Sequence, residues 1–149
     1  MKDCFAFDLD GTLADGDHRL HHIKKDPKDW ATYFAACWAD KPIAHNIAIL
    51  RALSMHYDVF ILTGRSDEVR EMTMAWLKQY IPDVSFWHSD VYMREAGDHR
   101  NDDVLKILML ENLKLRGYNV LAAFDDRDRV VAAWRGAGVP CLQVAPGSF

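Results

Sequence analysis

Two carboxylates, Asp8 and Asp10, follow directly on an apolar run that begins at Cys4. A carboxylate in this position can attack phosphorus and form an acyl phosphate, which divides a difficult hydrolysis into two steps. A second acid two residues further on can protonate the leaving oxygen and then activate water. We therefore interpret Asp8 as a candidate nucleophile and Asp10 as a candidate general acid and base. An ordinary Asp-Gly turn after a strand is the alternative interpretation.

A hydroxyl and a guanidinium follow a second apolar run. The run Val59–Leu62 leads into Thr63, Gly64 and Arg65. A hydroxyl between a strand end and a helix N-terminus can hold a phosphate oxygen. An arginine can clamp a phosphate with two parallel hydrogen bonds. We expect these three residues to bind a substrate phosphate, although a helix-capping turn would explain them equally well.

A lysine and an acidic pair complete the set of reactive side chains. Lys106 lies in the first turns of a predicted helix, where it is either a solvated lysine or a charge that offsets a phosphate. Asp125 and Asp126 follow another apolar run, and adjacent carboxylates repel each other unless a cation intervenes. Mg²⁺ prefers carboxylate and phosphate oxygens. The pattern therefore predicts a Mg²⁺ site formed by Asp8, the backbone carbonyl of Asp10, and one of Asp125 and Asp126.

Short apolar runs alternate with helical patterns through most of the chain. The predicted strands cover 4–9, 59–62, 84–87, 120–124 and 141–144, and the predicted helices begin near 42, 66, 102 and 130. The runs lack alternating polar residues, which is typical of strands buried on both faces. This order predicts an α/β fold, a Rossmann-like three-layer sandwich around a mostly parallel sheet with right-handed crossovers. Such a sheet binds its ligand at the carboxyl ends of its strands, where the candidate residues lie.

Residues 15–41 interrupt this repeat, and we interpret them as a small helical insert over the mouth of the site within one domain, 1–149. The insert contains His18, His21, His22, Trp30, Tyr33, Phe34 and Trp38. The aromatic residues recur at helical spacing, so we expect them to form the core of the insert. A stacking platform for a nucleobase is the rival interpretation. The histidines are expected on a solvated surface, because no cysteine lies at a zinc-ligand spacing.

Composition narrows the function classes. The chain has 149 residues and a formal net charge of −4, which disfavours tight duplex binding but permits a local basic site for one strand end. No apolar run approaches the roughly 18 residues of a membrane span, so we expect no membrane association. Cys4, Cys37 and Cys141 are expected to be buried and reduced. No signal-peptide pattern opens the chain, so we expect a cytoplasmic protein, and we infer no stable protein partner.

Four motifs in this order resemble the haloacid-dehalogenase (HAD) superfamily of phosphohydrolases. The DxDGT motif of that superfamily matches Asp8–Thr12, its second motif matches Thr63, its motif lysine matches Lys106, and its acidic fourth motif matches Asp125–Asp126. The resemblance implies a HAD-like fold, an aspartyl-phosphate intermediate and a Mg²⁺ cofactor. An acid at position 10 points to phosphate chemistry, because the dehalogenases of the superfamily lack it.

Two C-terminal stretches, 94–106 and 125–149, are similar to the 3′-phosphatase domain of phage polynucleotide kinase/phosphatase. This resemblance implies that Arg65 and Arg94 contact the substrate phosphate beside Lys106, and that the substrate is the 3′ end of a nucleic acid. We expect Asp102 to cap a helix and Arg127 to be a helix-surface charge.

Other functions stay open on the sequence alone. A phosphatase for (deoxy)nucleoside monophosphates suits the acidic net charge and the small domain. A non-catalytic phosphate-binding module has no need of both a nucleophile and an acid. A phosphate-transferring mutase would need a larger cap to shield the intermediate from water.

Overall fold

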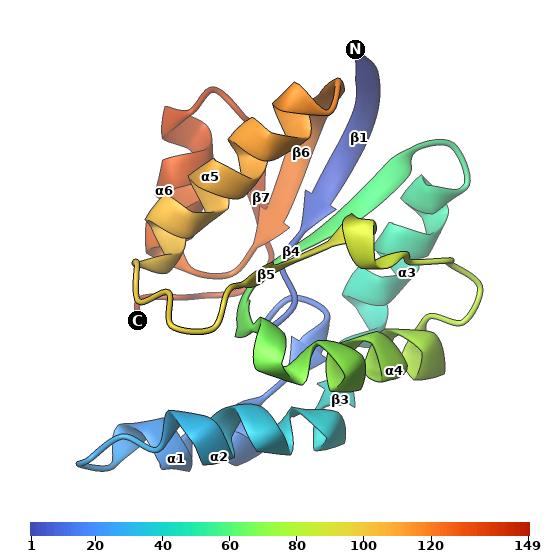
Figure 1. Ribbon diagram of the computed structural model, residues 1–149. Coiled ribbons are helices and arrows are strands. Elements are labelled where there is room, and N and C mark those ends of the chain that lie inside the picture. The colour runs from blue at the N-terminus through green and yellow to red at the C-terminus, as the bar shows by residue number, and fades with distance from the viewer.

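The computed structural model describes all residues, 1–149, and has a five-stranded parallel sheet at its centre (Figure 1). The strand order is β5-β4-β1-β6-β7. The bounds are β1 Lys2–Phe7, β4 Asp58–Ser66, β5 Val91–Arg94, β6 Tyr118–Asp125 and β7 Cys141–Gln143. Every neighbouring pair runs parallel, which confirms the predicted parallel α/β sheet.

Four longer helices cover the two faces of the sheet. Their bounds are α3 Ala44–Ser54, α4 Arg70–Tyr80, α5 Asp102–Leu115 and α6 Asp128–Gly136. Buried side chains of α5 and α6, which lie side by side, form one core with one face of the sheet (Figure 1). Buried side chains of α3 and α4 form a second core with the other face. These layers follow from right-handed crossovers, because the chain moves outward from β1 first in one direction and then in the other.

The third strand differs from the prediction. Residues 84–87 form no strand and lie in an irregular connection that leads through the 3-10 helix η4, His88–Asp90, to β5. Trp87 is 74% exposed, whereas Val91 and Met93 of β5 are buried on alternate positions. The segment that is buried in the sheet, Val91–Arg94, therefore forms the strand, although it is more polar than residues 84–87. Strand β4 is also longer than predicted and includes Thr63, Gly64 and Arg65.

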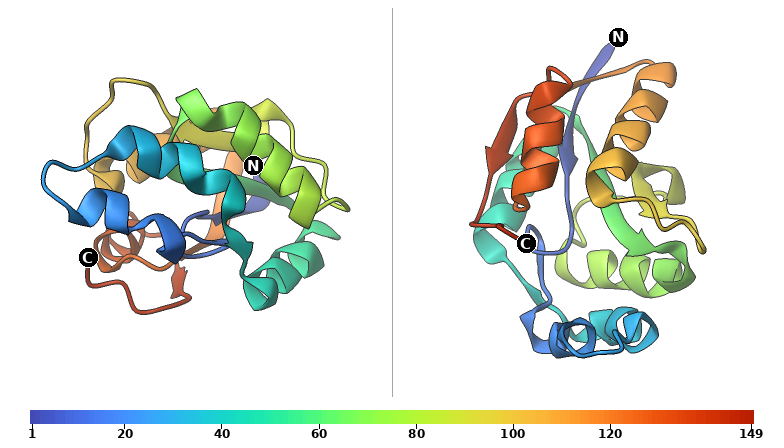
Figure 2. Two further views of the ribbon diagram at one scale, coloured as in Figure 1. Left: turned by 90° about the horizontal axis from the view of Figure 1, so that it is seen from below. Right: turned by 90° about the vertical axis from the view of Figure 1, so that its left-hand side faces the viewer.

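The insert after β1 forms a cap beside the carboxyl ends of the strands (Figure 2). It consists of β2 Ala14–Asp15, η1 Asp17–Arg19, α1 His21–Lys24, α2 Trp30–Ala35, η2 Ala36–Ala39 and β3 Lys41–Pro42. Strands β2 and β3 pair antiparallel and bring its two ends together. The prediction of an aromatic core is wrong, because Trp30 is 47% and Trp38 66% exposed and α1 and α2 bury no residue.

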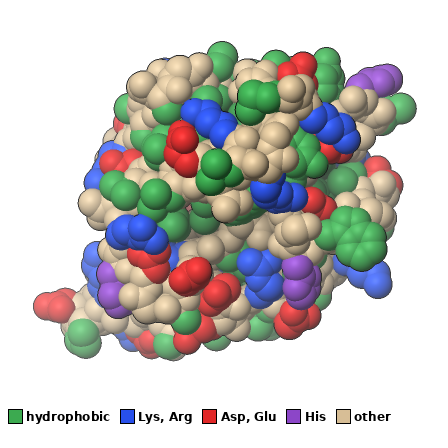
Figure 3. Space-filling model, turned by 45° about the horizontal axis from the view of Figure 1, so that its top comes forward, with side chains coloured by type: hydrophobic (Ala, Val, Ile, Leu, Met, Phe, Trp, Pro, Cys, Tyr) green, Lys and Arg blue, Asp and Glu red, His purple; other side chains and the backbone are tan.

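All three cysteines are free and buried, as predicted. No helix has the length and apolarity that a membrane crossing requires. Basic and acidic side chains are interspersed on the face drawn in Figure 3, so no broad basic track crosses that face.

Candidate active site

Asp8 and Lys106 meet at the carboxyl end of the sheet. The Lys106 ammonium donates to Asp8 Oδ1 at 2.8 Å and to Asp125 Oδ2 at 3.0 Å. Strands β1 and β6 are parallel neighbours, and the Asp8 amide donates to the carbonyl of Phe124 at 2.9 Å. Burial would lower the pKa of Lys106, but the charges of Asp125 and Asp8 outweigh burial and raise this pKa. The lysine is therefore a buried cation held between two carboxylates.

Three carboxylates gather around this lysine. One oxygen each of Asp8, Asp125 and Asp126 lies within 4.8 Å of the others, and only 10% of the Asp8 side chain is exposed. Burial, and next the Asp125 charge, raise the pKa of Asp8 well above its ordinary value. The same two causes raise the pKa of Asp126 to about 6. One ammonium cannot balance three carboxylates, so the donor set suits a hard divalent cation such as Mg²⁺.

Gly11 allows the turn after β1 to approach Asp126. Its φ is +81°, and a Cβ at this position would lie 2.1 Å from Asp126 Oδ2. A residue with a side chain would be strained here and would push the carboxylate away. Thr12 donates its hydroxyl to Asp8 Oδ2 at 3.3 Å, so the same turn also orients the candidate nucleophile.

Asp10 lies outside the carboxylate cluster, between two buried arginines. Arg65 Nη2 donates to Asp10 Oδ1 at 2.5 Å, and Arg19 Nη2 donates to the same oxygen at 2.6 Å. Both arginines also donate to Asp40, whose side chain is fully buried. Burial would raise the pKa of Asp10, but Arg65 and Arg19 outweigh burial and lower it. The candidate acid and base is thus held in place as a carboxylate.

Sequence reasoning missed Arg19 and Asp40. Both belong to the cap, yet their side chains are fully buried. Arg19 stands among histidines and lysines that are mostly exposed, so its type and position gave no signal of burial. The cap therefore contributes directly to the surroundings of Asp10.

The side chain of Arg65 is directed into the protein. Besides Asp10 and Asp40, it donates from Nη1 to Thr73 Oγ1 at 3.1 Å. Thr63 is buried, and its Oγ1 accepts the backbone N–H of Arg65 at 3.1 Å. Arg65 thus stands beside Asp10, with its guanidinium already engaged by protein groups.

Arg94, the last residue of β5, joins β4, the loop that follows β5, and the start of α5. Its Nε donates to the carbonyl of Gly64 at 2.9 Å, and its Nη1 donates to the carbonyls of Asp98 and Arg100 at 3.1 and 2.6 Å. Its Nη2 donates to the carboxylate of Asp102. Arg94 therefore has four protein acceptors and supports β4 at Gly64.

Asp102 is not the helix cap that we predicted. Asn101 occupies the N-cap of α5, and the Asp102 carboxylate accepts from both Arg94 and Arg127, the latter at 2.7 Å. Arg127 is accordingly not a free surface charge. The Asp102 carboxylate therefore links Arg94, at the end of β5, to Arg127, in the turn after β6, and does not cap its own helix.

A parallel sheet with an Asp-x-Asp turn, a buried lysine and an acidic pair at its carboxyl end is the arrangement of the HAD-type phosphatases, and the chain is such an enzyme. A family model described as "Polynucleotide kinase PNKP phosphatase domain" matches residues 2–149. The chain therefore belongs to this family of phosphatase domains, which confirms the resemblance inferred from residues 94–106 and 125–149.

Similar proteins agree with this assignment. A protein of Autographa californica nuclear polyhedrosis virus, named as a bifunctional polynucleotide kinase/RNA ligase, is 30% identical over 137 residues, which is 91% of this chain and 18% of the viral protein. A chain in the structure of a Pnkp1/Rnl/Hen1 complex superposes with a TM-score of 0.79 at 28% identity, over 100% of this chain and 47% of that chain. This chain thus spans less than half of either relative.

A more distant structure shares the fold. The class C acid phosphatase from Bacillus anthracis has a TM-score of 0.67 at 12% identity, over 99% of this chain and 67% of that chain.

Proposed function

We propose that this phosphatase removes the 3′-phosphate from a polynucleotide end, with Asp8 as nucleophile and Mg²⁺ as cofactor. The observation that carries the proposal is the contact of the Lys106 ammonium with both Asp8 and Asp125 inside a cluster of buried carboxylates. Membership of the polynucleotide kinase phosphatase family supports a nucleic-acid end as the substrate.

In the first step, a carboxylate oxygen of Asp8 attacks phosphorus, and the bond from phosphorus to the 3′ oxygen breaks. Asp10 gives its proton to this leaving oxygen, which becomes a hydroxyl. Asp10 needs to take up that proton as substrate binds, and the nearby negative charge of a phosphate favours this by raising its pKa.

In the second step, Asp10 accepts a proton from water, and the water oxygen attacks phosphorus. The bond between Asp8 and phosphorus breaks, and inorganic phosphate leaves. Arg19 and Arg65 hold Asp10 as a carboxylate, which is the form that this step requires.

Mg²⁺ would bind to Asp8, to the backbone carbonyl of Asp10 and to one or both of Asp125 and Asp126. It would neutralise these oxygens and polarise the phosphoryl group. The Thr63 hydroxyl and the Gly64 backbone would hold phosphate oxygens. Direct phosphate contacts by Arg65 and Arg94 stay predictions, and the protein partners of these arginines support a positioning role for both.

The similar structures are also informative about protein partners. A similar chain occurs in a Pnkp1/Rnl/Hen1 complex, which argues against the expectation that this phosphatase has no stable protein partner.

Phosphate release from four matched substrates tests the substrate class. These are a 3′-phosphorylated oligonucleotide, its 5′-phosphorylated twin, and the 3′- and 5′-mononucleotides, each with Mg²⁺ and with EDTA as the blank. We expect preference for the 3′-phosphorylated oligonucleotide. Preference for a mononucleotide would favour a nucleotidase, which the net charge of −4 suits. No release from any of the four would contradict the proposal.

A further inference from the structure

Aromatic side chains of the cap form an exposed cluster beside the site. The ring centroids of Trp30 and Tyr33 are 5.6 Å apart, and those of Trp30 and Phe34 are 5.9 Å apart with an angle of 28° between the rings. Trp30 is 47% exposed, and Tyr33 and Phe34 are half-buried. The helix that carries them buries no residue, so each of these aromatic side chains keeps part of its surface accessible.

A chain of direct contacts connects this cluster to the candidate acid and base. Arg19 Nη2 lies 2.6 Å from Asp10 Oδ1, and the Arg19 guanidinium lies 4.3 Å from the centroid of the Tyr33 ring. Burial, and next the Asp10 charge, raise the pKa of Tyr33 to about 12. The Arg19 guanidinium therefore contacts both Asp10 and the Tyr33 ring, and the cluster extends from Tyr33 outward to the exposed Trp30.

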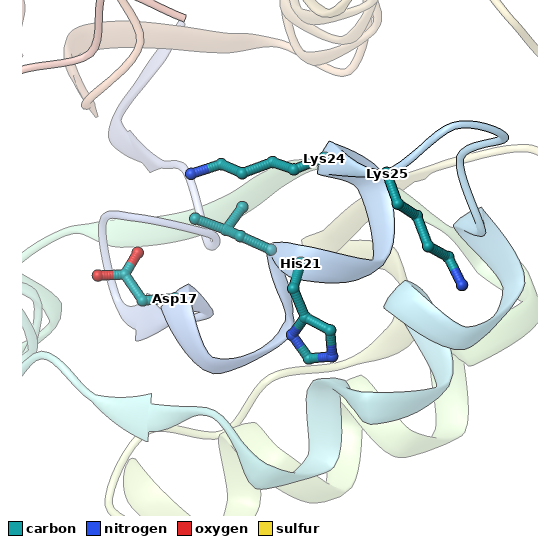
Figure 4. Close-up of a pocket in the computed structure, with 5 residues that line it drawn as sticks. Asp17, His21, Lys24 and Lys25 are labelled. Atoms are coloured by element: carbon teal, nitrogen blue, oxygen red, sulfur yellow. The ribbon is translucent and has the colours of Figure 1, made fainter.

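A lysine borders the aromatic cluster, and two more lie in the neighbouring segment. Lys28 Nζ lies 5.8 Å from the Trp30 ring centroid. An open hollow of about 560 Å³ along η1 and α1 is lined by Asp17, Leu20, His21, Lys24 and Lys25. In Figure 4, Lys24 and Lys25 extend to opposite sides of α1. Lys24 forms no ion pair, and Lys25 reaches Asp29 only at 3.9 Å. Residues 24–29 hold three lysines and two aspartates, Asp26 and Asp29, so this segment has a net charge of +1 in a chain with a net charge of −4.

We propose that Trp30, Tyr33 and Phe34, here called the cap platform, stack unpaired bases next to the terminal nucleotide of a single-stranded polynucleotide. Lys28 holds a phosphate between these bases. Aromatic faces stack on every base, and cations beside them attract the backbone, which is how single strands bind without sequence preference. This inference rests on the proposed function, because it gives the cap a role in guiding the strand end.

The charge of the border selects this occupant. An apolar peptide would need an apolar border, whereas the Lys28 ammonium beside Trp30 complements a polyanion. Duplex DNA would need phosphate contacts across a wide basic face, and the lysines here occupy only the short segment 24–28. One unpaired strand end is the polyanion whose size fits.

The test combines binding with turnover. Fluorescence anisotropy measures the Kd of a labelled oligothymidylate, and kcat/KM is measured with a 3′-phosphorylated oligothymidylate and with p-nitrophenyl phosphate. Trp30→Ala should weaken oligonucleotide binding and kcat/KM by about five- to a hundredfold. It should leave p-nitrophenyl phosphate turnover unchanged, and Trp30→Phe should restore most of the loss.

Two controls isolate stacking from other effects. Trp87→Ala removes another exposed tryptophan, 74% accessible and outside the cap, and should change nothing. A 3′-phosphorylated oligonucleotide with abasic sites next to its terminal nucleotide should bind wild type and Trp30→Ala equally. Lys28→Gln should weaken binding at low salt and reduce the salt dependence of Kd.

The outcomes separate this inference from the proposed function. Unchanged oligonucleotide Kd and kcat/KM in Trp30→Ala, with 3′ ends still dephosphorylated, would overturn the cap platform and leave the proposed function intact. Equal losses on the oligonucleotide and on p-nitrophenyl phosphate would also overturn the platform. A wild-type protein that binds the oligonucleotide through Trp30 without removing its phosphate would support the platform and overturn the proposed function.

Discussion

Lys106 Nζ lies 2.8 Å from Asp8 Oδ1, although the two residues are 98 positions apart in the sequence. The same ammonium reaches Asp125 at 3.0 Å, so one cation holds β1 and β6 together at their charged ends. Removing one partner of a buried charge pair leaves the other partners uncompensated and costs more than an exposed pair does.

Lys106→Ala should therefore lower both stability and activity. We expect the free energy of unfolding to fall by about 3 kcal/mol or more, measured by urea denaturation without Mg²⁺. Lys114→Ala on the same helix is the matched control, because Lys114 is 42% exposed and pairs with Glu111 on the surface. Equal stability of the two variants would show that the buried lysine contributes nothing beyond an exposed one.

Asp8→Asn should remove turnover and leave the fold intact. The two side chains are nearly isosteric, but an amide is a poor nucleophile, so kcat should fall by at least about a thousandfold. Circular dichroism checks the fold, and Asp83→Asn, at a carboxylate with 57% side-chain exposure, is the control for the same chemical change. Activity near wild type in the Asp8 variant would rule out the aspartyl-phosphate.

Arg19→Ala should lower kcat more than it changes KM. Without this guanidinium, Asp10 loses one of its two hydrogen-bonded partners, and its geometry and pKa both change. We expect a loss of about a hundredfold in kcat, with partial recovery in Arg19→Lys because a lysine still supplies the charge. A variant that lost stability but kept the wild-type kcat in its folded fraction would make Arg19 purely structural.

Mg²⁺ should stabilise the folded protein as well as activate it. A ligand that binds only the native state raises stability by about 2.7 kcal/mol at a hundredfold excess over its Kd. Differential scanning calorimetry should therefore show a higher Tm with Mg²⁺ than with EDTA. Asp126→Asn removes a carboxylate of the cluster and should reduce this shift. An identical Tm with and without Mg²⁺ would contradict a site formed by these carboxylates.

Gly147→Ala should disturb the acidic pair Asp125–Asp126, although Gly147 is far from this pair in the sequence. A Cβ at Gly147 would lie 1.9 Å from the carbonyl oxygen of Asp126, and backbone atoms cannot move aside cheaply. We expect a lower Tm and a kcat at least about tenfold lower, because a small misplacement of reacting groups slows catalysis. Gly136→Ala is the control, since a methyl group added there would meet no other atom within 4 Å, and it should be neutral or stabilising.

Much of the sheet and of the reactive set could be predicted from local pattern. Asp8, Thr63 and Asp125 each follow or end an apolar run, and parallel strands bring such ends to one edge. The prediction of a strand at 84–87 was wrong, and it was made because the apolar pattern of these residues resembles that of a buried strand. Pairing with β4 instead selected Val91–Arg94, and pairing is a property of the assembled sheet.

The sequence by itself determined the parallel α/β class, the nucleophile and acid candidates, the lysine and the acidic pair, because these depend on residue types beside hydrophobic runs. Only the tertiary structure decided how Asp10 is held. Its partners Arg19 and Arg65 lie 9 and 55 positions away, and both share Asp40. A buried ion pair depends on which charged groups lie close together in the folded protein. The residues next to an arginine in the sequence do not indicate which carboxylate it will contact.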